Sequence, residues 1–447
     1  MIPTIIRYTF LPLIPLYFFF VFLIQPVHGI NIQRVESPAG IVAWLVQDKT
    51  IPLITLRFAF KMAGTAYDPP RKEGLARMVA ALLDEGAGNL NSQKFQLQLE
   101  KLAARLQFFA STDNFSGLFQ TLSKNKSKAF RLLSNALTKP RFDPEEIERI
   151  RAETMRLLNR KAKDPNTILI RTWYKTVFPA HPYGRQKDGS IVSVNSITPQ
   201  DLRNFIAKHF LKNSLMVSVV GDITAKELAV KLDQIFGELP VFALRQILPD
   251  VLPSGAGKII VIKKEIPQSL VMFGVPGIKR KDPDWYAGFV MNEILAGGGL
   301  SSRLMEEVRE KKGLAYSVYS YFNTYDHSEL YIGQVSTKNA RVAETLNIIR
   351  KEWRRMAKNG VSKKELEVAK KYINGSFPLN FDSTKRISRI LLNVQLNDLG
   401  IEYLKVRKNL INRVTVSDVK RVAKRFLRPD VLTITIVGEP KGVQPSF

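Results

Sequence analysis

The sequence predicts an α+β fold of two homologous domains, each a mostly antiparallel sheet layered with helices, which face each other across a cleft. Three observations predict it. The second half of the chain repeats the pattern of the first, strands with an alternating apolar face precede long amphipathic helices in both halves, and a proline-rich segment separates them. With 447 residues, 45% of them hydrophobic, the chain is long enough for more than one domain.

The clearest repeat lies at the end of each half. The stretch ITPQDLRNFIAKHFLKNSLMVSVVGDI, from Ile197, matches VTVSDVKRVAKRFLRPDVLTITIVGEP, from Val414. In each, a threonine and an aspartate precede an amphipathic helix, and a β-rich strand ends at a glycine, Gly221 or Gly438. The match indicates an old duplication, and ligands commonly bind in the cleft between two such domains.

Other segments align in the same order. The strands in DKTIPLITLRFAFKMAG and KEIPQSLVMFGVPG are each followed by Asp-Pro and a helix, and two later helices follow the N-cap candidates Asp143 and Ser362. Each half is predicted as strand, helix, helix, strand, long helix, helix, and a last helix and strand. We place the N-terminal domain at residues 30–240, the linker at 241–257 and the C-terminal domain at 258–447.

Residues 1–29 are predicted to be a secretory signal peptide. Arg7 precedes a long apolar run, and Val27 and Gly29 have the small-residue spacing that a signal peptidase accepts. An uncleaved membrane anchor is the alternative, because the run approaches the length of a membrane span. The expected location is the periplasm or the exterior, with the inner membrane as the alternative, and a membrane is a partner only if the leader is retained.

The composition narrows the chemistry. The sequence contains no cysteine, which excludes thiolate catalysis, disulfides and Cys-ligated metals. The formal net charge of +27 would suit nucleic acid, but lysine and arginine are spread over helices among acidic residues, and an exported protein is separated from the chromosome. We therefore expect no nucleic-acid partner, and a basic surface that faces acidic peptides, an acidic partner or an anionic envelope.

Four features together resemble the insulinase and pitrilysin family of inverted-zincin peptidases, which includes the subunits of the mitochondrial processing peptidase and secreted bacterial relatives. They are the duplicated architecture, GLARMVAALLDEGA at 74–87, HPYGR at 181–185, and LAGGGLSSRLMEEVREKKGLAYSVYSYF at 295–322. The resemblance covers nearly the whole chain after the leader. The chain resembles a non-catalytic subunit of this family, because the segment at 74–87 lacks His-x-x-Glu-His.

In active relatives that segment carries two histidines that bind Zn²⁺ and a glutamate that activates the metal-bound water. The resemblance places the two ligands at Arg77 and Ala81 and the base at Ala80. Neither a guanidinium nor a methyl group donates an electron pair to zinc, so we expect no metal site in this chain. Glu73 and Asp84 are the candidate salt-bridge partners of Arg77.

Other side chains offer no evident replacement for the zinc site. The family's third ligand, a glutamate, falls near Glu153. His181 lies in the HPYG turn, to which the resemblance gives a structural role. His209 ends a helix whose repeat counterpart carries Arg425, which suggests a solvated position or an interaction with the helix dipole, and His327 lies in a polar turn. We expect no zinc hydrolysis by the chain alone.

The C-terminal half keeps another part of the family's machinery. In active relatives an arginine and a tyrosine seven residues later reach across the cleft to the substrate, and REKKGLAY supplies Arg309 and Tyr316 at this spacing. A phenol can stabilise a developing oxyanion, and a guanidinium can hold a substrate carbonyl. The structural alternative is that Arg309 pairs with Glu306 or Glu310 while Tyr316 packs in a strand.

A glycine cluster, Gly297, Gly298 and Gly299, precedes the Arg309 segment. It could form a tight turn, and phosphate binding is not expected because no Gly-Lys-Ser/Thr follows it. The non-catalytic subunit of the processing peptidase has a glycine-rich loop at the comparable place that contributes to substrate handling. The resemblance therefore implies that these glycines contact a peptide substrate.

The leading hypothesis is the non-catalytic subunit of a heterodimeric zinc metallopeptidase. Such a subunit would bind extended peptides and supply Arg309 and Tyr316 to a composite active site. Its partner would be a homologous subunit that carries the zinc, and this chain would need no cofactor of its own. The alternatives are a peptide-binding or scaffold protein without a proteolytic role, and a peptidase with a relocated metal site.

Overall fold

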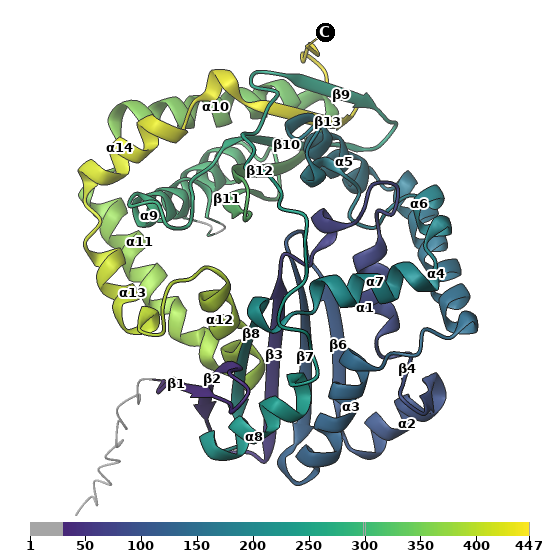
Figure 1. Cartoon of the computed structure of the whole chain (residues 1–447). Coiled ribbons are helices and arrows are strands. Elements are labelled where there is room, and N and C mark those ends of the chain that lie inside the picture. Colours follow the sequence, from purple (N-terminus) through teal and green to yellow (C-terminus); the bar gives the residue numbers. More distant parts are fainter. Residues whose placement is uncertain (1–29, 298, 300, 447) are drawn as a thin grey trace, which may run out of the picture. The chain divides into compact units, whose positions relative to one another are not determined.

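Two β-sheets, one from each half of the chain, organise the fold (Figure 1). The computed structural model describes residues 30–297, 299 and 301–446. The strand order is β1-β2-β8-β3-β7-β6 in the first sheet and β11-β12-β10-β13-β9 in the second. The strands are β1 (Gln33–Glu36), β2 (Val42–Gln47), β3 (Leu53–Lys61), β6 (Arg105–Ala110), β7 (Asn114–Leu122), β8 (Leu215–Gly221), β9 (Ile259–Lys263), β10 (Gln268–Pro276), β11 (Val318–Thr324), β12 (Glu329–Lys338) and β13 (Thr433–Gly438), with β4 (Gly86–Ala87) and β5 (Leu90–Asn91) paired separately.

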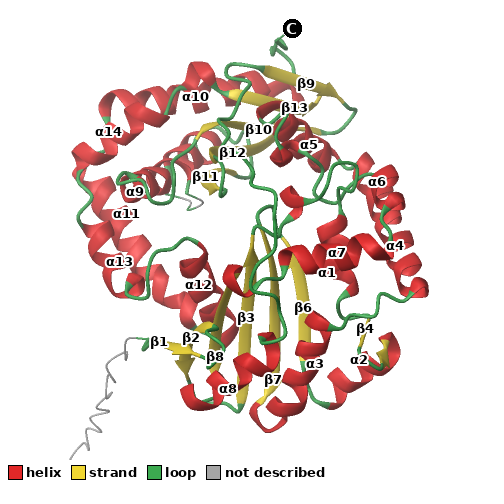
Figure 2. Cartoon of the chain, in the orientation of Figure 1, coloured by secondary structure: helices red, strands yellow, loops and turns green. Residues whose placement is uncertain are grey.

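Helices cover these sheets, and in Figure 2 α10, α11, α13 and α14 lie along the outer side of the second half. The helices are α1 (Leu75–Leu82), α2 (Ser92–Lys101), α3 (Lys126–Thr138), α4 (Pro144–Lys163), α5 (Pro165–Val177), α6 (Ile191–Ser196), α7 (Pro199–His209), α8 (Ala225–Phe236), α9 (Trp285–Ala296), α10 (Val342–Asn359), α11 (Lys363–Ser376), α12 (Thr384–Leu396), α13 (Tyr403–Asn412) and α14 (Val416–Phe426). Each sheet has one parallel pair, β2 with β8 and β9 with β13, among antiparallel ones. The predicted α+β class with mostly antiparallel sheets is confirmed.

The duplication extends to individual side-chain contacts. Phe58 on β3 lies opposite Gly117 on β7, and Phe273 on β10 lies opposite Gly333 on β12. A methyl group added to Gly117 would lie 2.2 Å from the Cζ atom of Phe58, and one added to Gly333 would lie 2.3 Å from that of Phe273. The ring therefore occupies the space that a side chain would need, and both sheets use the same device to pack an aromatic residue over a strand.

The repeated helix starts are also equivalent. Thr198 and Thr415 each accept a hydrogen bond from the backbone N–H of an aspartate three residues later, whose carboxylate accepts one in return from the threonine N–H. Ser362 caps α11 in the same way, as predicted. Asp143 is at the N-cap position of α4 but makes no side-chain capping bond, because its carboxylate instead accepts from Arg141 Nε at 2.7 Å.

Each half lends one helix to the other half's sheet, which the sequence did not predict. Helix α5 packs on β10 and β13, and α12 packs on β3 and β8. The Trp173 indole N–H donates to the backbone carbonyl of Thr433 at 3.1 Å, and the Ser218 hydroxyl donates to that of Ser388 at 2.8 Å. The two halves are therefore interlocked through buried hydrogen bonds, and residues 32–447 form one compact unit.

A separate apolar cluster lies where the halves meet. Trp173, Tyr183 and Phe178 from the first half pack with Met272 and Ile332 from the second. The expected linker at 241–257 is irregular and runs along this junction. Its Leu248 joins the cluster, and its backbone bonds to both halves, for example from the Val251 N–H to the His327 carbonyl at 2.9 Å.

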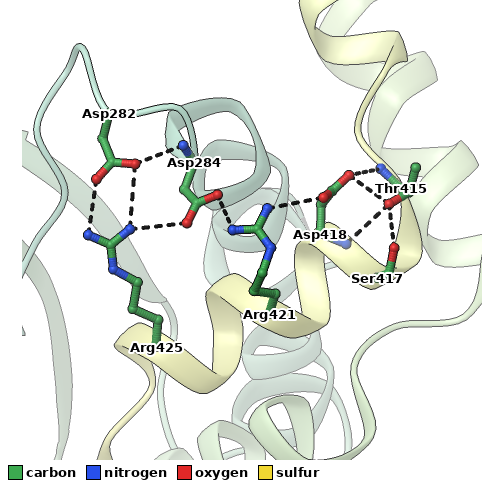
Figure 3. Close-up of polar contacts among 7 residues, drawn as sticks. All are labelled: Asp282, Asp284, Thr415, Ser417, Asp418, Arg421 and Arg425. Atoms are coloured by element: carbon green, nitrogen blue, oxygen red, sulfur yellow. Dashed lines mark hydrogen bonds and ion pairs between the residues drawn. The ribbon is translucent and has the colours of Figure 1, made fainter.

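An ion-pair network fastens α14 to the start of α9 (Figure 3). Arg425 bonds to Asp282 at 3.0 Å and to Asp284 at 3.0 Å. Arg421 bridges Asp284 and Asp418, the aspartate that caps α14 through Thr415. Asp282 belongs to the Asp-Pro pair that follows the strand in KEIPQSLVMFGVPG. It thus helps to anchor α14, the last helix of the second half, to the start of α9.

One detail of the predicted organisation differs. The sequence predicts one strand between the early helices and the long helix of each half. Each half instead has an antiparallel pair of strands there, β6 with β7 in the first half and β11 with β12 in the second. The turns between the strands contain polar residues without a strong glycine signal, so each pair resembles one long strand in the sequence. The predicted leader, residues 1–29, lies outside the described residues. Among described helices, none has the length and apolarity needed to span a bilayer.

Candidate functional site

Helix α1 carries the positions that correspond to the family's zinc motif, and a buried aspartate fixes where it begins. The two carboxylate oxygens of Asp68 accept hydrogen bonds from the backbone N–H groups of Gly74 at 2.8 Å and Ala76 at 2.9 Å. Burial raises the pKa of Asp68 to about 7, although these two bonds favour the ionised form. Gly74 precedes the helix in a left-handed conformation (φ 96°), which favours glycine.

Three side chains of α1 replace a metal-binding set. Arg77 and Ala81 are exposed on one face of the helix, as the i, i+4 spacing predicts, and Ala80 is buried. The Arg77 Nε lies 3.6 Å from an oxygen of Asp188. The predicted partners, Glu73 and Asp84, were wrong, because the loop that follows HPYGR places Asp188 beside this face of α1.

The residues present do not fit a zinc ion. Arg77, Ala80 and Ala81 offer no neutral nitrogen or anionic donor. Within residues 30–446, apart from the two undescribed positions, no three His, Asp or Glu side chains are grouped to hold a metal. Glu153, near the expected third ligand, is exposed on α4. No chemical step through a metal is therefore assigned to this chain.

The histidines have structural surroundings. His181 Nδ1 accepts from the Tyr183 backbone N–H at 3.3 Å, and a methyl group on Gly184 would lie 2.0 Å from the Phe178 carbonyl oxygen, so the HPYG turn has the structural role that was predicted. His327 was predicted to lie in a polar turn, and it bonds to Tyr67 and Asp250, both at 3.2 Å.

The solvated position predicted for His209 is wrong. Its side chain is buried, and its Nδ1 lies 2.8 Å from the Met62 carbonyl oxygen. Burial lowers the pKa of His209 to about 4, so the ring is neutral at pH 7 and does not interact with the helix dipole as a cation. Its repeat counterpart, Arg425, is half-exposed in the network of Figure 3, so the equivalent position has a different environment.

Two adjoining cavities border Arg77. One, of about 480 Å³, is lined by both halves: Thr112 and Asp113 follow strand β6, and Tyr321 and Asn323 belong to β11. The other, of about 230 Å³, is lined by α5 and by the segment from Tyr183 to Asp188. The zinc-motif face of α1 therefore borders a space between the two halves, which is the place where the sequence predicts a ligand-binding cleft.

Lys187 lies in both cavities, and sequence reasoning missed it. Its ammonium group is 5.7 Å from the centre of the Tyr174 ring and 5.8 Å from that of Tyr325. Burial, followed by the charge of Arg77, lowers the pKa of Lys187. The only signal in the sequence was a lysine two residues beyond HPYGR, and nothing local shows that Tyr325, on the other half, would lie beneath it.

Asp113 is the acidic residue among those that line the larger cavity. It accepts hydrogen bonds from the Tyr183 hydroxyl at 2.7 Å and from the Asp326 backbone N–H at 3.2 Å. Burial, together with the neighbouring charge of Asp326, raises the pKa of Asp113 to about 6. This carboxylate therefore ties the HPYG turn to the second half.

Arg309 and Tyr316 lie together on the second half. Arg309 is on a π-helical turn, η5 (Met305–Glu310), and its guanidinium carbon is 4.9 Å from the centre of the Tyr316 ring. The Tyr316 side chain is 83% exposed and precedes β11, so the alternative in which it packs in a strand is wrong. Arg309 does contact Glu310, at 3.4 Å, which is one of the pairings expected for a structural role.

Gly299 of the glycine cluster borders a third cavity, of about 260 Å³, between the end of α9 and α11. Gly297 is the C-cap of α9, and a methyl group there would lie 2.6 Å from the backbone Cα atom of Glu293, so a side chain at this position would require the backbone to shift. Gly299 lines the cavity with Glu293 and Tyr372. Gly298 lies outside the described residues.

The structure thus brings the predicted residues together in three separate places. Arg77 and Ala81 share one face of α1, Arg309 stacks on Tyr316, and Gly299 borders its own cavity. Neither Arg309 nor Tyr316 lines the two cavities beside Arg77. The arginine–tyrosine pair therefore lies outside the two cavities that border the degenerate zinc motif.

Comparisons with known proteins define the class. The chain matches the profile of the insulinase family (peptidase family M16) over residues 53–187 and that of the peptidase M16 inactive domain over residues 196–373. A crystal structure of a peptidase M16 inactive domain from Pseudomonas fluorescens has a TM-score of 0.86 and 27% identity, and the match covers 93% of this chain and 100% of that one. The fold is that of two M16-type domains. The chain belongs to the insulinase family, peptidase family M16.

Relatives in this family carry different descriptions. A non-peptidase homologue from Helicobacter pylori is 26% identical over 396 residues, which are 88% of this chain and 91% of the relative. An uncharacterised zinc protease from Streptomyces coelicolor is 25% identical over 438 residues (95% and 93%). A probable mitochondrial-processing peptidase subunit beta from Schizosaccharomyces pombe is 24% identical over 405 residues (85% and 86%). Family membership therefore leaves activity to be argued from the site itself.

Proposed function

We propose that this protein is the non-catalytic subunit of a heterodimeric zinc metallopeptidase. One observation carries the proposal: α1 presents Arg77 and Ala81 where zinc ligands would stand, while Arg309 and an exposed Tyr316 remain paired on the other half. A side chain that is mostly exposed and makes no hydrogen bond to any described residue has no evident structural task in this chain. In a composite site it would donate a hydrogen bond to the oxyanion of a tetrahedral intermediate formed at the partner's zinc.

Peptide binding is supported by two free sheet edges. Strands β6 and β11 are edge strands, and each pairs with one neighbour in the described part of the chain. The residues that follow β6 and the strand β11 both border the larger cavity. An extended peptide can add to such an edge through backbone hydrogen bonds, which tolerate many side-chain sequences.

A partner surface is supported by the linker. Five large apolar residues of the linker are between 62% and 85% exposed, namely Val241, Phe242, Leu244, Ile247 and Leu252. Exposed large apolar side chains so close together in one segment favour a protein–protein interface. We propose that the partner is a homologous, zinc-bearing subunit and that residues 1–29 export this chain to the periplasm, where N-terminal sequencing of the mature protein would locate the cleavage site.

A scaffold role without proteolysis is the second candidate. It is favoured by the description of the Helicobacter pylori relative as a non-peptidase homologue. The two candidates differ in whether a zinc-bearing homologue gains activity from this chain. They share the peptide-binding cleft.

The test is reconstitution with the zinc-bearing homologue encoded by the same organism. The mixture should cleave a library of fluorogenic peptides in a chelator-sensitive way, while this chain alone should not. Arg309→Ala and Tyr316→Phe should each lower kcat by about tenfold to a hundredfold, the size expected for lost transition-state hydrogen bonds. Arg131→Ala, an exposed arginine on α3, is the matched control. Full activity of the mixture with either variant would contradict the proposal, as would chelator-sensitive cleavage by this chain alone.

A further inference from the structure

The smaller cavity beside Arg77 is unusually rich in positive charge. Arg77, Arg171, Arg185 and Lys187 line it, against one carboxylate, Asp188. That carboxylate is shared, because Lys161 also binds it, with its Nζ 2.6 Å from an Asp188 oxygen. The cationic side chains therefore exceed the negative charge available to them within the cavity.

Lys187 shows the imbalance most clearly. Among the described residues no carboxylate is within ion-pair distance of its ammonium group, and Asp113 and Asp188 act on it only at longer range. It instead lies over the faces of Tyr174 and Tyr325. A partly buried ammonium beside a guanidinium disfavours its own charged form, and an anion placed between the two would relieve both the repulsion and the lost hydration.

The position of this charge indicates what the anion belongs to. The smaller cavity adjoins the larger one through Arg77, Tyr174 and Lys187, which line both. Strand β6 runs toward the larger cavity and ends at Ala110, and the next two residues line that cavity, so a peptide paired parallel to this edge would reach the cationic group with its carboxyl end. Arginine forms paired hydrogen bonds with a carboxylate, and lysine adds a point charge.

We propose that Arg77 and Lys187 bind the terminal carboxylate of an extended peptide held in the cleft. The inference rests on the proposed function and makes it more specific, because it names the end of the substrate that the degenerate zinc site recognises. In this view α1 has exchanged a metal cation for a guanidinium, and the site retains affinity for an oxygen-bearing group without the ability to hydrolyse it.

The experiment compares capture of peptides that differ only at the carboxyl end. The purified full chain is immobilised and exposed, at physiological salt, to two pools of randomised decapeptides, one with free carboxyl ends and one amidated. Bound peptides are quantified by mass spectrometry. The free-acid pool should be captured about tenfold more strongly, which corresponds to ~1.4 kcal/mol. Arg77→Ala and Lys187→Met should remove this preference, and Lys187→Arg should keep most of it.

The controls separate the site from general charge. Arg131→Ala and Lys128→Met remove exposed cations from α3 and should leave the preference unchanged. Circular dichroism of each variant establishes folding, and the Lys187 pair carries the test if Arg77→Ala does not fold.

Each remaining outcome overturns a defined statement. Equal capture of both pools refutes carboxylate recognition and leaves peptide binding intact, whereas capture of neither pool refutes the proposed function and the inference with it. A free-acid preference that survives both the Arg77 and the Lys187 variants shows that the carboxylate binds elsewhere. Enrichment of Asp and Glu in the amidated pool, dependent on Arg77, assigns the site to an acidic side chain and overturns the terminal assignment.

Discussion

Asp68 gives the start of α1 a pH-dependent stability. Its carboxylate is buried and its pKa is raised from 3.8 to about 7. A carboxyl group whose pKa is higher in the folded than in the unfolded state stabilises the fold fully only at low pH. That contribution to stability is lost as the pH rises through the pKa of the folded state. Between pH 5 and pH 8 the two pKa values imply a loss of about 2 to 3 kcal/mol from this one group.

Asp68→Asn removes the titration but keeps an oxygen that can accept from Gly74 or Ala76. The free energy of unfolding of the variant, relative to the unmodified protein, should therefore rise by about 2 to 3 kcal/mol between pH 5 and pH 8. Chemical denaturation of both proteins at the two pH values measures this difference, and all other titrating groups cancel in it. Asp164→Asn is the matched control, because the hydrogen bonds of Thr167 lower the pKa of Asp164 and it titrates below both pH values. A relative stability of Asp68→Asn that is the same at both pH values would refute the reasoning.

Three further substitutions test the packing by thermal or chemical denaturation. Gly117→Ala should destabilise the fold by about 1 to 3 kcal/mol, because the added methyl group overlaps the buried Phe58 ring, and no loss would contradict that packing. Trp173→Phe leaves the Thr433 carbonyl without its indole donor and should cost about 1 to 3 kcal/mol, so an unchanged denaturation midpoint would contradict the interlocking of the halves. Tyr316→Ala should change the free energy of unfolding by less than about 1 kcal/mol, since its ring is exposed; a larger loss would mean that Tyr316 is structural.

The sequence by itself determined the features that depend on residues close together in the chain. The capping pairs that start at Thr198 and Thr415 involve residues three apart, and their recurrence shows the duplication without any structure. The substitution of His-x-x-Glu-His by Arg77, Ala80 and Ala81 is likewise a matter of side-chain chemistry, because no conformation gives a methyl group an electron pair for zinc.

Only the tertiary structure decided the environment of those residues. The partner of Arg77 is Asp188, the rings beneath Lys187 include Tyr325, and the helix α5 covers the other half's sheet. Each of these contacts joins segments that are about ninety residues or more apart. Burial and charge balance are sums over such distant neighbours, so His209 and Arg425 can occupy equivalent places in a repeat and still be buried and neutral in one case and half-exposed and charged in the other.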